Sequence, residues 1–251
     1  MRNVIRRVTA TPLGRWLYHP FQFLIHLTRR LRYPDIPIDH TITRVSYRQR
    51  EFFIERRRWS NGDKSVIDQC FAQAQYDMPS GAHGVLIERI YREIVASGKK
   101  PLIVDCGANI GASVLWFTAR YSQAHIVALE PSPSNFALLR SNCSGLDIDL
   151  RQAGIGPVDG TAWMSNPDDD VSCRTNDNHE GIEVDIVSLR TMLESKQASS
   201  YSPFLLKLDI EGAEQSLFTG PPSVLDQFPL IIMEPHDWLF PGQRTSVDGR
   251  Q

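Results

Sequence analysis

The sequence contains few cysteines and no long apolar run. Its four cysteines are spread over 251 residues and include no C-x-x-C pair, which excludes a zinc ribbon and gives no sign of a disulfide framework. No apolar stretch reaches the roughly 18–20 residues that a membrane-spanning helix needs. The composition, 41% hydrophobic and 22% charged, excludes a disordered, collagen-like or coiled-coil chain. We therefore expect a globular protein in a reducing compartment, the cytoplasm.

Charge is distributed unevenly along the chain. Residues 1–60 hold 13 basic and 4 acidic side chains, whereas residues 61–251 hold 14 basic and 25 acidic ones. We interpret residues 1–60 as a basic, helical appendage and residues 61–251 as the main domain. The apolar run 21–27, followed by three arginines, fits an amphipathic helix at the inner membrane surface or a helix packed on the main domain. The acidic main domain would repel phosphates, so we expect no nucleic-acid partner.

Short apolar runs in the main domain alternate with helical patterns. Five runs, each closed by polar or glycine residues, predict buried strands at 101–105, 125–130, 148–153, 204–209 and 230–234. Helical spacing predicts helices at 63–75, 85–97, 112–121, 133–142 and 213–218. This alternation predicts an α/β fold with a Rossmann-like, doubly wound and mostly parallel sheet. Two further strands, 161–165 and 182–187, are expected around an acidic loop at 168–170.

The first of these strands ends in the segment VDCGANIG, at which a helix begins. Gly107 and Gly111 permit a tight turn and the close approach of a ligand, because neither carries a Cβ. A dinucleotide fingerprint requires G-x-G-x-x-G, but here the spacing is G-x-x-x-G with Asn109 in the middle. Asp105, at the last strand position, would repel a pyrophosphate. Its carboxylate instead suits a cation such as the α-ammonium of S-adenosylmethionine.

The second predicted strand ends at Glu130, nineteen residues after Gly111. A carboxylate at that position can accept hydrogen bonds from both hydroxyls of a ribose. Pro131 and Ser132 follow and complete the predicted nucleoside site, with Ser132 as the N-cap of the next helix. The pattern D-x-G-x-x-x-G, followed by a strand-end glutamate, is the arrangement of a methyltransferase.

Charged residues also gather at the ends of the last two predicted strands, in LLKLDIEGAE and IIMEPHDW. Strand alternation puts Lys207 and Asp209 on one side. Burying such groups is costly without a ligand or partners, so they form either a ligand cleft or an internal ion network such as Lys207 with Glu234. No two of these carboxylates, nor His236, lie at a reliable metal-ligand spacing, so we predict no metal site.

The segments VDCGANIG, ALEPSPSNF, AGIG, LLKLDIEGAE and IIMEPHDW together resemble the FkbM-type family of S-adenosylmethionine-dependent methyltransferases, over roughly residues 103–238. The resemblance implies a class I methyltransferase fold and O-methylation of hydroxyls on sugars, polyketides or similar small metabolites. Glu130 would then bind the ribose, Ile155 would lie against the adenine, and Asp209 would close the methionine side. The residues implied around the methionine moiety are Asp105, Gly107, Asn109 and Gly111.

A hydroxyl acceptor is a poor nucleophile, so a positioned base would help it to attack. The candidates are His236, because imidazole titrates near neutrality, and Glu211, beside the expected methyl donor. His236 could equally be a loop histidine with only a structural hydrogen bond. Class I methyltransferase sheets usually end in an antiparallel pair of strands. Only sixteen residues follow Pro235, too few for such a pair, so we expect a short C-terminus.

Two other functions stay open. The short C-terminus favours a catalytically inactive domain that keeps the fold and binds a nucleoside or a partner protein. A nicotinamide-dependent oxidoreductase is the other alternative, although Asp105 and the missing middle glycine of the fingerprint argue against it.

Overall fold

The computed structural model describes residues 37, 39–78, 81–165, 174–176, 181–195, 200–210, 217 and 224–234. The chain forms two compact units, one of Met1–Thr41 with Arg57–Trp59 and the other of Ile42–Arg56 with Ser60–Gln251. The helix expected in the basic appendage, the acidic loop and most of the helix expected at 213–218 lie outside the described residues. Within the described ranges, no helix is long and apolar enough to cross a membrane.

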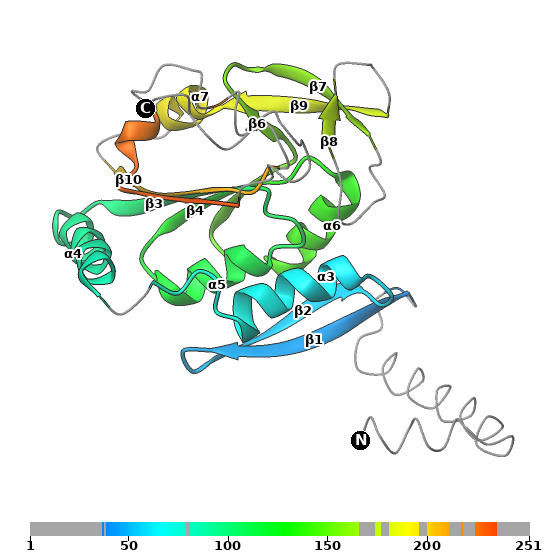
Figure 1. Cartoon of the computed structure of the whole chain (residues 1–251), viewed down its shortest axis with the longest axis horizontal. Coiled ribbons are helices and arrows are strands. Elements are labelled where there is room, and N and C mark those ends of the chain that lie inside the picture. The colour runs from blue at the N-terminus through cyan, green and yellow to red at the C-terminus, as the bar shows by residue number, and fades with distance from the viewer. Residues whose placement is uncertain are drawn as a thin grey trace, which may run out of the picture. The chain divides into compact units, whose positions relative to one another are not determined.

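A five-stranded parallel sheet forms the centre of the larger unit (Figure 1). Its strands are β3 (Lys100–Cys106), β4 (His125–Leu129), β5 (Ile148–Arg151), β10 (Tyr201–Leu208) and β11 (Leu230–Met233). Their order is β11-β10-β3-β4-β5, which confirms the five predicted strands and the doubly wound α/β class. The chain leaves β3 toward β5 and later returns on the other side of β3, so the strand order reverses between β3 and β10. Sheets of this class bind ligands at that point, beyond the carboxyl ends of the strands.

Helices cover one face of this sheet (Figure 1). They are α3 (Asn61–Ile67), a π-helix (Asp68–Ala72), α4 (Ala82–Ala96), α5 (Ala112–Arg120) and α6 (Pro133–Asn142). Ile103, Ile126 and Leu205 point toward them, because alternate strand residues face opposite sides of a sheet. α6 has the predicted bounds and begins as expected, since Ser132 accepts a hydrogen bond from the N–H of Asn135 as its N-cap.

A β-hairpin that was not predicted belongs to the same layer. It consists of β1 (His40–Tyr47) and β2 (Arg50–Arg57), and its inward side chains join the apolar cluster under the sheet: Val45, Tyr47, Phe52 and Ile54. Asn142, at the end of α6, accepts a hydrogen bond from the N–H of Glu55 (2.7 Å) and donates one to its carbonyl (2.9 Å). The larger unit therefore includes residues 42–56 of the segment that we interpreted as an appendage.

The opposite face of the sheet packs against α7 (Leu189–Glu194) and a second, four-stranded sheet. That sheet has the order β6-β9-β7-β8, with strands β6 (Gly154–Gly156), β7 (Gly160–Ser165), β8 (Arg174–Asn176) and β9 (Ile182–Ser188). The extra strands expected at 161–165 and 182–187 are thereby confirmed as β7 and β9. Neither β6, β8 nor α7 was predicted from the sequence.

Candidate functional site

The turn between β3 and α5 is built from three residues with left-handed backbone angles. The φ angles are 80° at Gly107, 50° at Asn109 and 90° at Gly111. A Cβ on Gly107 would collide with the carbonyl oxygen of Asp209, and one on Gly111 would press on the side chain of Leu139. The two glycines are therefore required by backbone conformation and by packing within the chain, as the expected tight turn needs, while their close approach to a ligand stays a prediction.

Backbone hydrogen bonds attach this turn to the neighbouring strand ends. The N–H groups of Gly107 and Ala108 donate to the carbonyl of Leu129, at 3.0 and 2.9 Å. The N–H of Asp209 donates to the carbonyl of Cys106 at 3.1 Å. The ends of β10, β3 and β4 thus form one connected edge, as expected for the carboxyl ends of adjacent parallel strands.

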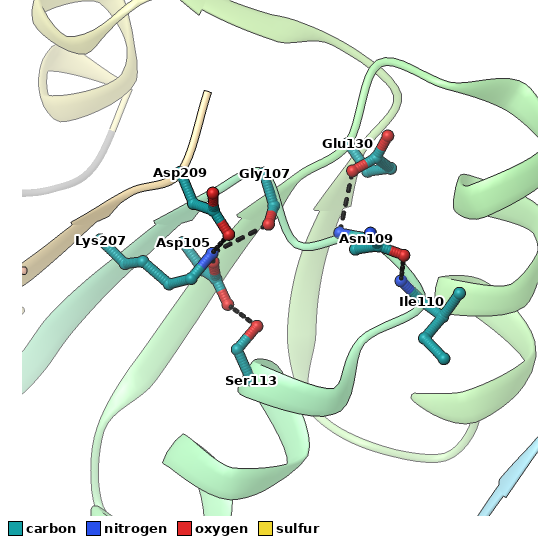
Figure 2. Close-up of polar contacts among 8 residues, drawn as sticks. All are labelled: Asp105, Gly107, Asn109, Ile110, Ser113, Glu130, Lys207 and Asp209. Atoms are coloured by element: carbon teal, nitrogen blue, oxygen red, sulfur yellow. Dashed lines mark hydrogen bonds and ion pairs between the residues drawn. The ribbon is translucent and has the colours of Figure 1, made fainter. Parts of the chain in front are cut away.

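Glu130, directly after β4, is held by two backbone N–H groups. Asn109 donates to one carboxylate oxygen at 2.8 Å (Figure 2). Ser132 donates to the other at 2.9 Å. Only 5% of Glu130 is exposed. Burial raises its pKa to about 7, although these two N–H groups favour the charged form. The carboxyl group is therefore fixed in orientation and titrates near neutrality.

Asp105, the last but one residue of β3, is completely buried. Lys207 lies directly opposite it in the β3–β10 register, and its Nζ is 3.1 Å from Oδ1 of Asp105. Ser113 donates a hydrogen bond of 2.6 Å to the other oxygen, Oδ2. Asp105 thus lies buried beside Lys207, and its direct contact with a cofactor cation stays a prediction.

Lys207 connects the end of β10 to the glycine turn (Figure 2). Its side chain is 3% exposed, and Nζ donates to the carbonyl of Gly107 at 2.9 Å and lies 3.4 Å from Oδ2 of Asp209. Burial alone would lower the pKa of Lys207, but Asp105, with Tyr76 and Asp209, raises it well above the usual value. Of the two carboxylates beside Lys207, Asp209, 30% exposed, is the one that faces solvent.

Comparison with known proteins decides the family. Residues 105–247, more than half of the chain, match the family model described as the methyltransferase FkbM domain. The chain belongs to this family.

Two relatives of this FkbM domain are named as methyltransferases. Methyltransferase 1 of Beauveria bassiana (strain ARSEF 2860) is 26% identical over 164 residues, which is 54% of this chain and 64% of that protein. Methyltransferase sdnD of Sordaria araneosa is 38% identical over 65 residues, 24% of this chain and 25% of the other. The chain thus spans less than two thirds of the length of either relative.

A crystal structure of Methyltransferase FkbM from Methylobacillus flagellatus KT is also similar to part of the chain. The two proteins are 19% identical, and the matched region is 53% of this chain and 32% of the other. They superpose with a TM-score of 0.35.

The other predicted site residues of the FkbM domain divide into described and undescribed ones. Ile155 lies in β6 and is 95% buried in the apolar cluster on the second face of the sheet, and Pro131 is half-buried beside Glu130. Glu211 and His236 lie outside the described residues, so their catalytic roles stay predictions. Among the described residues, no cluster of His, Cys, Asp or Glu side chains could hold a metal ion.

Sequence reasoning missed two residues that support this site. Ser113 binds Asp105, and Asn142 donates a 2.8 Å hydrogen bond to the carbonyl of Ile110 in the turn while also holding the β1–β2 hairpin. We expected an internal ion network as one alternative, with Glu234 as the partner of Lys207. In the structure, the partners of Lys207 are Asp105 and Asp209. Opposite charges on adjacent parallel strands were the available signal for the Asp105 pair.

Two surface grooves of the domain lie elsewhere. One runs along α4 and reaches Arg120, and the other is lined by Tyr121, Gln123 and Asp147. Both are at the C-terminal end of α5, whereas the glycine turn precedes its first residue. We therefore do not assign either groove to the site.

Proposed function

We propose that this chain is an S-adenosylmethionine-dependent methyltransferase that methylates a hydroxyl group of a small metabolite or sugar. The observation that carries the proposal is Glu130, a buried carboxyl group beside the turn, in a chain of the FkbM methyltransferase family. Both of its oxygens are oriented by backbone N–H groups and retain further lone pairs. Such a group is suited to accept hydrogen bonds from the two hydroxyls of a ribose.

The charges of the site also fit this cofactor. S-adenosylmethionine carries a sulfonium and an ammonium, and when bound it supplies the methyl group as an electrophile. The cluster holds two carboxylates, Asp105 and Asp209, to the one ammonium of Lys207, and the partly exposed Asp209 would attract such a cation. Asp209 would hold the ammonium, Glu130 the ribose, and the turn from Gly107 to Gly111 would lie between them.

The residues that we propose to act on the acceptor, His236 and Glu211, lie outside the part of the chain that the structure describes. His236 or Glu211 would take the proton of the attacking hydroxyl, and in-line alignment of acceptor and donor would supply much of the acceleration. A cytoplasmic location is part of the proposal, with the arginine-rich residues 1–36 as the candidate for contact with an anionic membrane surface.

One observation favours a second candidate, a binding domain without catalysis. Lys207 pairs with Asp105 from within the chain, so Asp105 has a counter-charge without a cofactor. A domain of that kind would still bind a nucleoside through Glu130 but would have no turnover.

Isothermal calorimetry with S-adenosylmethionine tests the proposal. We expect binding that Glu130→Gln weakens and that Asp147→Asn, at an exposed carboxylate beyond the opposite end of the sheet, leaves unchanged. The absence of binding at millimolar cofactor would exclude the enzyme. A titration with NADH distinguishes an oxidoreductase. Mass-spectrometric detection of methylated products from sugar and polyketide hydroxyl acceptors separates the enzyme from the inactive binding domain.

A further inference from the structure

Lys207 is the one described side chain that contacts both carboxylates of the cluster and the glycine turn. We propose that Lys207 is a positioning residue of the cofactor site. It occupies the place beside Asp105 that a cofactor ammonium would otherwise take, and it leaves Asp209 as the carboxylate for the ligand. This inference rests on the proposed function and names which strand end binds the amino-acid part of the cofactor.

The geometry around the ammonium supports this role. An ammonium carries three N–H donors, and three oxygens lie around Nζ of Lys207: the Gly107 carbonyl at 2.9 Å, Asp105 at 3.1 Å and Asp209 at 3.4 Å. The second oxygen of Asp105 already accepts from Ser113. Asp105 is also inaccessible to solvent, so a ligand ammonium does not reach it as the structure stands.

Charge leads to the same assignment. Asp105 and Lys207 form a neutral buried pair, and a neutral pair attracts a cation only weakly. Asp209 shares the same lysine but at a longer distance, and part of its carboxylate is open to solvent. Asp209 is therefore the carboxylate of the cluster that a ligand can reach from solvent.

Lys207 also fixes the position of the turn relative to β10. Two hydrogen bonds hold the ends of β3 and β10 together. Nζ of Lys207 donates to the carbonyl of Gly107, and the N–H of Asp209 donates to the carbonyl of Cys106. Glu130 is attached to the turn separately, through the N–H of Asn109. Removing Lys207 should consequently disturb the methionine side of the site and leave the ribose side in place.

A comparison of two ligands tests this expectation in Lys207→Met. S-adenosylmethionine should bind at least about tenfold more weakly than to the wild type, because the carboxylate that holds its ammonium is no longer oriented. 5′-Methylthioadenosine, which lacks the amino-acid part, should change by less than about threefold. Lys100→Met, at an exposed lysine at the other end of β3, is the matched control and should change neither affinity.

Three outcomes would overturn the positioning role. Equal weakening of both ligands would indicate a general structural effect, and unchanged binding would show that Lys207 does not matter. Tighter binding of S-adenosylmethionine would mean that Asp105, once released, is the true ligand. If the wild type binds neither compound, the proposed function fails first and the positioning role fails with it.

A second measurement covers the case in which Lys207→Met alone does not fold. Urea unfolding of the wild type, Asp105→Asn, Lys207→Met and the double variant forms a double-mutant cycle without any ligand. Lys207→Met should raise the unfolding equilibrium constant by about 100-fold or more in the wild type, since it leaves a buried carboxylate alone. The same change in the Asp105→Asn background should cost far less, and the double variant provides the folded protein for the two-ligand test. Equal costs in both backgrounds would overturn the pairing on which the role depends.

Discussion

Asp105 and Glu130 stand at the ends of neighbouring parallel strands, and both are buried, but they are compensated in different ways. β10 brings the ammonium of Lys207 directly opposite Asp105. Glu130 receives peptide N–H groups from Asn109 and Ser132 instead, while β5 contributes only the carbonyl of Arg151, which accepts from the N–H of Glu130. A carboxylate with a fixed counter-charge is part of the scaffold, whereas one held by neutral dipoles keeps its charge available to a ligand.

The largest effect is expected when Asp105, the carboxylate that belongs to the scaffold, is removed. Asp105→Ala leaves the Lys207 ammonium buried without its nearest counter-charge, which should lower the free energy of unfolding by about 3–5 kcal/mol. Chemical denaturation measures this loss, and the cofactor dissociation constant should rise at least about tenfold in any folded fraction. Asp147→Ala, at a carboxylate 90% exposed, should change stability by less than about 0.5 kcal/mol. A loss for Asp105→Ala as small as that of the control would contradict the buried pair.

The turn between the two carboxylates should show the next largest effect. Gly107→Ala forces a side chain into a left-handed backbone and against the carbonyl of Asp209, which should cost about 3 kcal/mol of stability. Gly98 has the same φ of 80° but nothing near its missing Cβ, so Gly98→Ala should cost only about 1 kcal/mol. Thermal or urea unfolding of the two variants separates backbone strain from collision. Equal costs would mean that the packing of Asp209 on the turn is not as described.

Glu130→Ala tests the ligand side of the comparison. Loss of the ribose acceptor should weaken nucleoside binding by about tenfold, or 1.4 kcal/mol, whereas the binding of free methionine should not change. Calorimetry with S-adenosylmethionine, 5′-methylthioadenosine and methionine measures the three affinities. If methionine binding fell as well, Glu130 would act on the whole site instead of on the ribose.

The smallest effect concerns the titration of Glu130. Its pKa is about 7 in the folded protein, whereas that of an ordinary glutamate is 4.5, so the folded state holds more protons between these values. Stability should therefore fall as pH rises through this window, because the proton favoured by the fold is lost. Affinity for the cofactor should rise, by about threefold between about pH 6.5 and 7.5, because the ionised form accepts both ribose hydroxyls. Glu130→Gln should flatten both profiles in denaturation and calorimetry, and a persistent slope would assign the titration to another group.

Local sequence patterns were sufficient to predict the central sheet and the family of the protein. The strands around Ile103, Ile126 and Leu205 are continuous apolar runs, and α6 carries a serine cap followed by proline, so each could be recognised within a few residues. The hairpin was missed because its inward alternation of Val45, Tyr47, Phe52 and Ile54 is interrupted by arginines and glutamates. We interpreted residues 1–60 as an appendage because of their net positive charge, although alternate residues of the hairpin pack on the core.

The site depended on information that is not local. Alternation placed Lys207 and Asp209 on one side of β10, but only the register between β10 and β3 places Lys207 opposite Asp105. The support of Glu130 depends on the left-handed backbone of Asn109, which directs its N–H at the carboxylate. The apolar packing of Ile155 likewise follows from the pairing of β6 with β9, which the sequence does not reveal.

The hairpin also determines which shortened forms of the protein can be useful. A fragment beginning at residue 61 would lack the fully buried Ile54, and truncations of a single such side chain already cost about 2–5 kcal/mol of a total stability near 5–15 kcal/mol. It would also remove the backbone partners of Asn142, whose amide holds the carbonyl of Ile110. Fragments intended for crystallisation or ligand screening should therefore retain the chain from at least residue 42.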